Sequence, residues 1–163
     1  MTPCSAWQLY VIVDRDVSGG RDLAQIAAAA IRGGADVLQL REKHATDAQV
    51  CRDAERLLPL TRAAGIPLII NDRIEVASQT GADGVHLGQA DPPVTEARRV
   101  LGPGRLVGKS THSLEQALAA EAEGADCVAV VRAVCAAEDP EAAARELKRL
   151  LRQSVRATSA RGL

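Results

Sequence analysis

The chain has 163 residues, a formal net charge of −1 and an aromatic content of 1%. This length suits one compact domain, whose core must be aliphatic because the chain has a single Trp, a single Tyr and no Phe. The near-neutral charge, without a concentrated basic stretch, argues against binding to nucleic acid or to a membrane surface. Aromatic side chains on which nucleobases could stack are scarce, and no apolar run approaches the ~20 residues of a membrane span.

The cysteines and histidines do not show the spacing of a metal site. The four cysteines have neither CxxC nor zinc spacing, and no secretory signal precedes them: Cys4, Cys51, Cys127 and Cys135. The three histidines are scattered along the chain: His44, His86 and His112. We therefore expect reduced thiols in a cytoplasmic protein and no histidine-based metal centre.

A Gly-Ala-Asp tripeptide occurs three times, at residues 34–36, 81–83 and 124–126. Each copy follows an Ala-rich amphipathic stretch and precedes a short apolar run. Glycine after a helical pattern predicts a helix C-cap, and a short run rich in Val and Leu predicts a buried parallel strand. This repetition predicts successive βα units, as in a (βα)n barrel or a doubly wound sheet.

Six βα units are predicted along the chain. The predicted strands cover residues 9–13, 37–40, 67–70, 84–87, 105–109 and 126–131. The predicted helices cover residues 22–32, 46–64 and 73–80, a stretch that begins near residue 92, and residues 113–123 and 139–153. No linker divides these units, so we predict a single domain over residues 1–153 and a frayed tail over residues 154–163.

Helix starts are marked by polar residues at capping positions. Thr46 and Ser113 each begin a capping-box pattern. Pro92 and Pro93 suit the first turn of the fourth helix, with Asp91 as its cap.

Polar clusters follow four successive predicted strands, and in a βα barrel such strand ends meet at one mouth, where active sites lie. Gln39, Arg41 and Lys43 alternate along the chain, so an extended backbone places them on one face. Two cations and an amide on one face suit a phosphorylated ligand. The alternative is that Arg41 and Lys43 form a solvated strand end, the usual fate of charged residues.

Two aspartates at neighbouring strand ends form the second candidate site. Asp72 and Asp91 could share Mg²⁺, which takes one or two carboxylates together with phosphate oxygens. N-capping of the next helix would explain either residue taken singly. Ser110, near a predicted helix N-terminus, adds a donor for phosphate, whereas Ser113 is expected to be a cap.

Four segments at these strand ends stand in a specific order. They are Gln39-Leu40-Arg41-Glu42-Lys43, Ile69-Ile70-Asn71-Asp72-Arg73, the run from Gly81-Ala82-Asp83-Gly84-Val85-His86 to Leu87-Gly88-Gln89-x-Asp91, and Gly108-x-Ser110-Thr111-His112-Ser113-Leu114-Glu115. Together they closely resemble the thiamine phosphate synthase family, in order and in register from about residue 9 to residue 126. The resemblance implies a TIM-type (βα)8 barrel that joins hydroxymethylpyrimidine diphosphate to thiazole phosphate with Mg²⁺.

The resemblance also implies roles for individual residues. By position, the residues that bind the pyrimidine diphosphate would be Gln39, Arg41, Lys43, Asn71 and Ser110, and the Mg²⁺ ligands would be Asp72 and Asp91. The implied mechanism is dissociative: diphosphate leaves, a pyrimidine methyl cation forms, and the thiazole nitrogen attacks it. Such a reaction needs charge neutralisation and positioning, so we expect no nucleophilic side chain.

The chain departs from this family after its third Gly-Ala-Asp copy. The family's Gly-Pro…Thr-x-Thr-Lys loop and its later Gly-Gly motif do not occur, and residues 127–140 resemble the last strand and the start of the last helix instead. We therefore expect a barrel shortened to about six units, without much of the thiazole phosphate site. The apolar sixth strand would lie at a new edge of the sheet, so we also expect a homo-oligomer or marginal stability.

Two alternatives to a synthase remain. A thiazole tautomerase has the same fold and the Ser-x-His-Ser stretch, and there His112 would carry out acid–base chemistry. A non-catalytic protein that binds a phosphorylated ligand is the other alternative. His86, inside a strand pattern, is expected to be a packed, hydrogen-bonded core residue.

Overall fold

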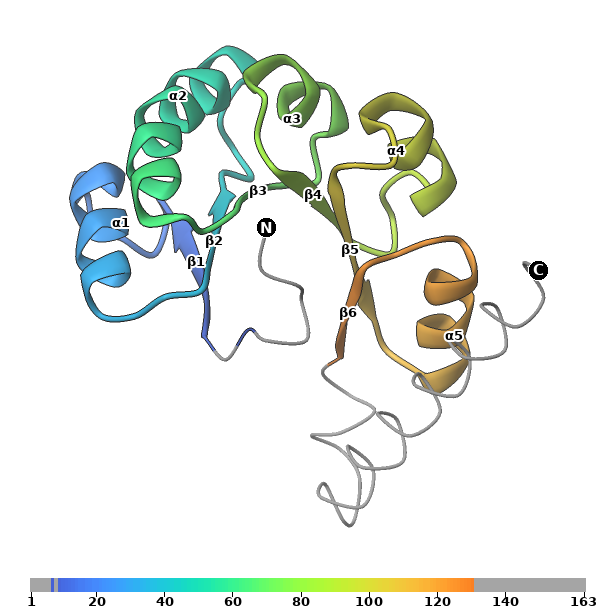
Figure 1. The fold of residues 1–163 in the computed structure, drawn as a ribbon. Helices are drawn as coiled ribbons and strands as arrows, with labels where there is room; N and C mark the ends of the chain where they lie inside the picture. The colour runs from blue at the N-terminus through green and yellow to red at the C-terminus, as the bar shows by residue number, and fades with distance from the viewer. Residues whose placement is uncertain (1–6, 8, 131–163) are drawn as a thin grey trace.

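The computed structural model describes residue 7 and residues 9–130. Six parallel strands form one sheet in chain order: β1 (Tyr10–Asp14), β2 (Val37–Arg41), β3 (Leu68–Asn71), β4 (Gly84–Leu87), β5 (Leu106–Thr111) and β6 (Cys127–Val130). The helices between them are α1 (Leu23–Arg32), α2 (Asp47–Ala64), α3 (Ile74–Thr80), α4 (Val94–Leu101) and α5 (Leu114–Ala122). Figure 1 shows a curved sheet with these helices along its outer side.

The predicted succession of βα units is confirmed through the sixth strand, with bounds that shift by one or two residues. The strand over residues 84–87 has the predicted bounds. The predicted helix over residues 139–153 and the tail over residues 154–163 lie outside the described residues. The boundaries of the predicted domain therefore stay a prediction.

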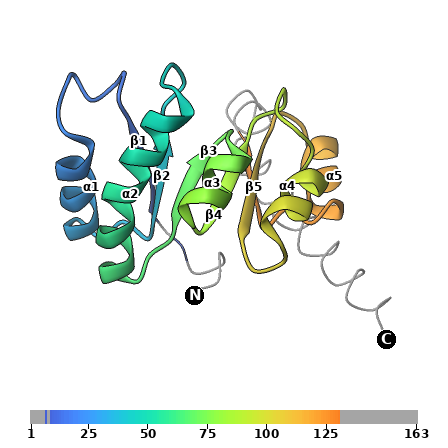
Figure 2. The same cartoon turned by 90° about the horizontal axis from the view of Figure 1, so that it is seen from above.

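The aliphatic core lies between the sheet and the helices. Leu38 and Leu40 of β2, Ile70 of β3 and Leu87 of β4 are fully buried there. Seen from above, the helices follow one another around the sheet and cover its convex face (Figure 2). Because side chains alternate along a strand, the residues between these core positions point to the concave face.

Glycine is required on the concave face where strands and side chains approach closely. A Cβ at Gly84 would collide with the carbonyl oxygen of Leu106 on the neighbouring strand. A Cβ at Gly108 would collide with Nδ1 of the His86 ring. The missing side chain of Gly108 therefore makes room for the imidazole of His86.

Side-chain caps fix the starts of three helices, and the first is Asp22, which accepts a hydrogen bond from the N–H of Ala24 at the start of α1. Thr46 Oγ1 accepts a hydrogen bond from the N–H of Gln49, and Ser113 Oγ accepts one from Gln116, which confirms both predicted caps. The interpretation of Asp91 as a helix cap is wrong, because Pro93 occupies the N-cap position of α4 and no side chain caps that helix. N-capping does not explain Asp72 either, since α3 begins after Arg73 without a side-chain cap.

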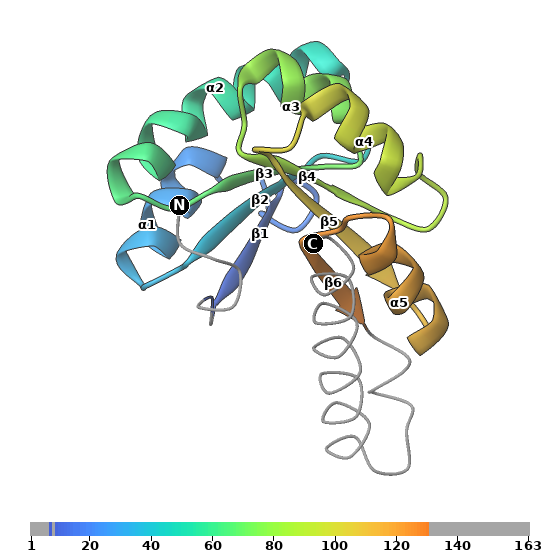
Figure 3. The same cartoon turned by 45° about the vertical axis from the view of Figure 1, so that its right-hand side comes forward.

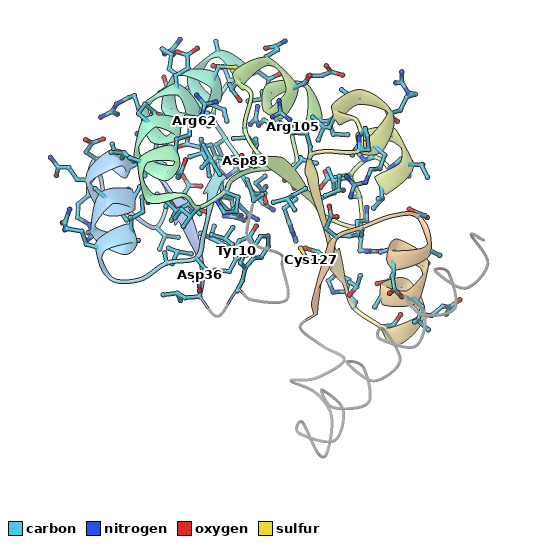
Figure 4. The ribbon with its side chains drawn as sticks, in the orientation of Figure 1. Tyr10, Asp36, Arg62, Asp83, Arg105 and Cys127 are labelled. Atoms are coloured by element: carbon cyan, nitrogen blue, oxygen red, sulfur yellow. The ribbon has the colours of Figure 1, made fainter. Side chains whose placement is uncertain are left out.

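The three Gly-Ala-Asp copies make the same contact at the amino-terminal ends of the strands. The carboxylates of Asp36, Asp83 and Asp126 accept hydrogen bonds from the backbone N–H of Leu9, Leu68 and Val107, at 2.9, 2.9 and 2.7 Å. The backbone N–H of each aspartate donates back to the carbonyl oxygen of the same partner. Asp36 and Asp83 are labelled in Figure 4. We call these three reciprocal contacts the aspartate clamps.

Within the described residues, β1 and β6 form the two edges of the sheet. Figure 3 shows the strands running side by side from β1 to β6. The predicted self-association through the sixth strand stays a prediction. Among the described helices, none combines the length and apolarity that a membrane crossing requires.

Candidate functional site

A cavity of about 330 Å³ opens at the carboxyl ends of the strands. Its lining comes from the segments that follow or end β2, β3, β4 and β5: Arg41, Lys43, Asn71, Asp72, His86, Gly88, Gln89, Ala90, Asp91 and Ser110. The structure thus brings together every site residue named from the sequence except Gln39. The parallel sheet explains this, because all its strand ends meet on one side.

Gln39 lies below the cavity and does not line it. Its side chain is buried in β2, and its Nε2 donates a hydrogen bond of 2.8 Å to the hydroxyl of Tyr10 on β1. Figure 4 labels Tyr10 on this inner side of the sheet.

Arg41 stands at the end of β2 and forms an ion pair with Asp14 at the end of β1. Burial acts to raise the pKa of Asp14, but hydrogen bonds from Arg41 and from the backbone N–H groups of Val17 and Asp16 hold the pKa below its ordinary value. Asp14 therefore stays ionised and orients the guanidinium. The charge of Arg41 is held in place at the cavity wall, and it is not a free solvated strand end.

The segment that carries Lys43 is held by two arginines that the sequence analysis did not single out. Arg15 Nε donates to both carboxylate oxygens of Glu42, at 3.0 and 3.1 Å. Arg73 donates to the carbonyl oxygens of Glu42 and Ala45, at 2.9 and 2.6 Å. The backbone on both sides of Lys43 is thereby fixed. No sequence spacing indicated these contacts, because they join residues from three different strand ends.

Asp72 and Asp91 both line the cavity, and their carboxyl groups interact with each other. Burial first, and then hydrogen bonding and charge repulsion from Asp91, raise the pKa of Asp72 to about 6. Lys43 and Asn71 act in the opposite direction. Two carboxylates this close repel each other when both are ionised, so the pair favours a proton or a cation between them.

Backbone contacts set the direction of both carboxylates. Asp72 has a left-handed backbone conformation with φ of 62°, and its N–H donates to the carbonyl oxygen of His86 at 2.8 Å. Asp91 Oδ2 accepts a hydrogen bond of 2.5 Å from the N–H of Gly88. A non-glycine residue with positive φ is uncommon, and such strain is often found at functional sites.

His86 and Ser110 form the far wall of the cavity. His86 Nε2 lies 2.9 Å from Ser110 Oγ, so the predicted hydrogen bond exists, but the ring lines the cavity as well as packing against the sheet. Burial lowers the pKa of His86, which favours the neutral ring. In the part of the chain that the structure describes, Nδ1 has no hydrogen-bond partner. Ser110 belongs to β5, so its hydroxyl and not a helix N-terminus faces the ligand space.

His112 lies apart from this wall. Its side chain is exposed, its backbone N–H donates to Gln116, and it is not among the cavity residues. Among the described residues, no three His, Cys, Asp or Glu side chains are grouped as a metal site, and Cys51 and Cys127 form no disulfide. Cys4 and Cys135 lie outside the described residues.

The family model for thiamine monophosphate synthase matches residues 9–159. The thiamine-phosphate synthase of Chloroflexus aurantiacus is 49% identical over 138 residues, which cover 85% of this chain and 63% of that protein. That of Chlorobium phaeovibrioides is 55% identical over 120 residues, which cover 74% of this chain and 56% of that protein. The chain thus spans less than two thirds of the length of these curated relatives.

Solved structures resemble the fold. The thiamine phosphate pyrophosphorylase from Pyrococcus furiosus has a TM-score of 0.68 and 27% identity, over 91% of this chain and 96% of that one. The 3-hexulose-6-phosphate synthase from Salmonella typhimurium, at 15% identity and a TM-score of 0.65 over 80% of this chain and 68% of that one, is similar in fold alone. These likenesses confirm the predicted TIM-like α/β fold. The extent of the family match, together with the identity to curated relatives, shows that the chain belongs to the thiamine monophosphate synthase family.

Proposed function

We propose that the cavity binds hydroxymethylpyrimidine diphosphate with Mg²⁺, and that the protein transfers the pyrimidinylmethyl group to the nitrogen of thiazole phosphate. The observation that carries this proposal is the meeting of two cations, an amide, a hydroxyl and two interacting carboxylates around one cavity. Anion-binding and cation-binding groups side by side suit a metal-bound diphosphate. A tautomerase has less support, because His112 stands outside the cavity.

The diphosphate would lie between Arg41, Lys43 and Ser110. Arg41 offers a planar pair of donors, which matches two phosphate oxygens. Lys43 supplies a compact charge from the fixed segment after β2, and Ser110 offers its hydroxyl from β5. Asn71, between the two sides, is placed to donate to the same ligand or to orient Asp72.

Asp72 and Asp91 are the residues that would hold Mg²⁺. Burial and the neighbouring Asp91 raise the pKa of Asp72, and the charge of Lys43 offsets them only in part. A cation between the two carboxylates would remove their repulsion, and Mg²⁺ commonly takes one or two carboxylates and keeps several waters. When bound, the ion would neutralise charge on the phosphate oxygens.

The reaction breaks the bond between the methylene carbon of the pyrimidine and the diphosphate oxygen, and the bonding electrons leave with the diphosphate. The nitrogen of the thiazole then forms the new bond to that carbon. Arg41, Lys43 and Ser110 would stabilise the charge that develops on the leaving group. The cavity needs no nucleophilic side chain for this step, and its described lining offers no cysteine or lysine beyond Lys43.

Thiazole phosphate, the second substrate, is the ligand for which this chain offers the fewest binding groups that we can name. The family resemblance assigns much of thiazole phosphate binding to late loops that this sequence lacks. The described cavity supports the diphosphate half of the site. Binding of the pyrimidine diphosphate without turnover would therefore identify a binding protein, the second candidate.

Because the proposed ligands are small phosphorylated metabolites, we also propose a cytoplasmic location for the protein.

The test is an assay for thiamine phosphate from both substrates with Mg²⁺, beside the longer Chloroflexus aurantiacus relative. Product that appears only with both substrates and Mg²⁺ supports a synthase. Calorimetry with the pyrimidine diphosphate is run in parallel. Saturable binding without product supports the binding protein, and absence of both contradicts the assignment of this cavity.

A further inference from the structure

Lys109 is a buried cation that the proposed reaction does not use. It lies in β5 two residues after Val107, a core residue, so alternation places both on the helix-facing side of the sheet. Lys109 is only 8% exposed. Lysine is rarely buried unless its ammonium group has partners.

The partners of Lys109 are backbone carbonyls at both ends of the loop between β4 and α4. Its Nζ donates to the carbonyl oxygen of Gly88 at 2.8 Å and reaches that of Pro92 at 3.5 Å. We call residues 88–92 the Asp91 loop. One ammonium group thus joins the first and last residues of the loop that carries a proposed Mg²⁺ ligand.

Gly88 links this contact to the carboxylate itself. Its carbonyl oxygen accepts from Lys109 and also from the backbone N–H of Asp91, at 3.3 Å. Its own N–H donates to Asp91 Oδ2 at 2.5 Å. The side chain of Gln89 is bonded to the carbonyl oxygen of Ser110, next to Lys109 in β5. The loop is therefore attached to β5 at two consecutive residues, and its conformation sets the position of the carboxylate.

We propose that Lys109 is a positioning residue that closes the Asp91 loop and holds the Asp91 carboxylate toward Asp72 for cation binding. This inference rests on the proposed function for the identity of the cation. The hydrogen bonds of Lys109 to the site go to the backbone of the Asp91 loop, and its charge also acts on His86, a residue of the cavity lining. Groups that orient a metal ligand from behind commonly change metal affinity when they are removed.

The two ways in which Lys109 could act predict opposite changes in Mg²⁺ affinity when it is removed. A buried positive charge near the carboxylates repels a second cation, so if charge were the main effect, removal of Lys109 would strengthen Mg²⁺ binding. If Lys109 acts by holding the loop, its removal weakens Mg²⁺ binding. The sign of the change therefore separates the two.

The experiment measures Mg²⁺ affinity by calorimetry, with and without inorganic diphosphate, in the full chain. Lys109→Met is expected to weaken Mg²⁺ binding about tenfold, and Lys109→Arg to restore most of it. The matched control is Arg98→Met. Arg98 also donates to a backbone carbonyl, that of Gly124 at 2.9 and 2.7 Å, but at the opposite end of the sheet. This variant is expected to lose stability and keep the parental Mg²⁺ affinity.

Unchanged or tighter Mg²⁺ binding in Lys109→Met would overturn the proposal. If that variant does not fold, Lys109→Gln replaces it, because an amide keeps a donor without the charge. Amide hydrogen exchange in residues 88–91 gives a readout that does not depend on the metal. It should accelerate in Lys109→Met and Lys109→Gln, and stay close to the parental rate in Lys109→Arg and Arg98→Met. A parent that binds no Mg²⁺ contradicts the proposed function, while the exchange measurement still decides whether Lys109 holds the loop.

Discussion

Aspartates stand at both ends of the sheet, and their surroundings differ. At the amino-terminal end, the aspartate clamps give Asp36, Asp83 and Asp126 a backbone N–H from the preceding strand. At the carboxyl end, Asp72 and Asp91 interact with each other, and the pKa of Asp72 rises. The first group satisfies the backbone and stabilises the fold. In the second group, burial and the neighbouring carboxylate disfavour ionisation of Asp72, and a bound cation would relieve this, as the proposed Mg²⁺ site requires.

The largest effect on ligand binding is expected from a substitution at the carboxyl end of the sheet. Asp91→Asn removes one of two negative charges and should weaken Mg²⁺-dependent diphosphate binding by about 100-fold or more. Calorimetry with Mg²⁺ and inorganic diphosphate measures the change. Asp36→Asn at the opposite end is the matched control and should bind as the parent does. Equal affinities for Asp91→Asn and the parent would remove Asp91 from the metal site.

Substitution of an aspartate in one of the clamps should lower the stability of the fold and leave diphosphate binding unchanged. Asp83→Ala leaves the N–H of Leu68, a fully buried residue, without its side-chain acceptor, and should lower the free energy of unfolding by about 1–3 kcal/mol. Urea denaturation measures this loss. Asp83→Asn keeps a carbonyl acceptor and should lose less. Diphosphate binding by the folded Asp83→Ala variant should be unchanged, and a weakened site would show that the two ends are not independent.

A smaller effect is expected for the arginine in the cavity wall. Arg41→Lys keeps the charge but cannot present two parallel donors, so inorganic diphosphate should bind about tenfold more weakly. Arg62→Lys, whose donor contacts the Gly81 carbonyl at the amino-terminal end, is the control and should bind normally. If Arg41→Lys and Lys43→Ala both bind as the parent does, neither charge contributes to diphosphate binding.

The smallest effect is expected in the pH dependence of stability that Asp72 causes. The pKa of Asp72 is raised from 3.8 to about 6, so the fold favours its protonated form, and the stability that comes from protonation is lost as the pH rises through about 6. Asp72→Asn cannot ionise and should therefore melt at a higher temperature than the parent above neutral pH without Mg²⁺. The difference should disappear below about pH 4. A constant difference at all pH values would contradict the raised pKa.

Much of the fold could be predicted because it depends on local patterns. Capping boxes located the starts of α2 and α5, and glycines after amphipathic stretches marked helix ends, with Gly34, Gly81 and Gly124 all at positive φ. Asp91 was misassigned because a carboxylate before two prolines is typical of a cap. In the structure, the carboxylate of Asp91 accepts a hydrogen bond from the backbone N–H of Gly88 in the loop before the helix.

The site could be predicted only in part. Its lining residues follow from the rule that the ends of parallel strands meet, and the motifs named most of them. The residues that hold the lining in place were missed, among them Arg15, Arg73 and Lys109. Their contacts are made to backbone carbonyls or to carboxylates that are distant in sequence. Such contacts leave no periodicity or spacing in the chain.

The aspartate clamps have a consequence for how βα units are connected. Each carboxylate recognises a backbone N–H, a group that nearly every residue carries, so the joint does not depend on the side chains of the preceding strand. The clamp at Asp126 joins β6 to β5 with the same contacts that join β2 to β1 and β4 to β3. The same backbone joint therefore serves three different strand pairs, while the match between neighbouring strands is made elsewhere, by contacts such as that of Gly108 with His86. A lineage that shortens or lengthens the sheet at such a joint keeps this contact and has to refit only the side chains between the new neighbours.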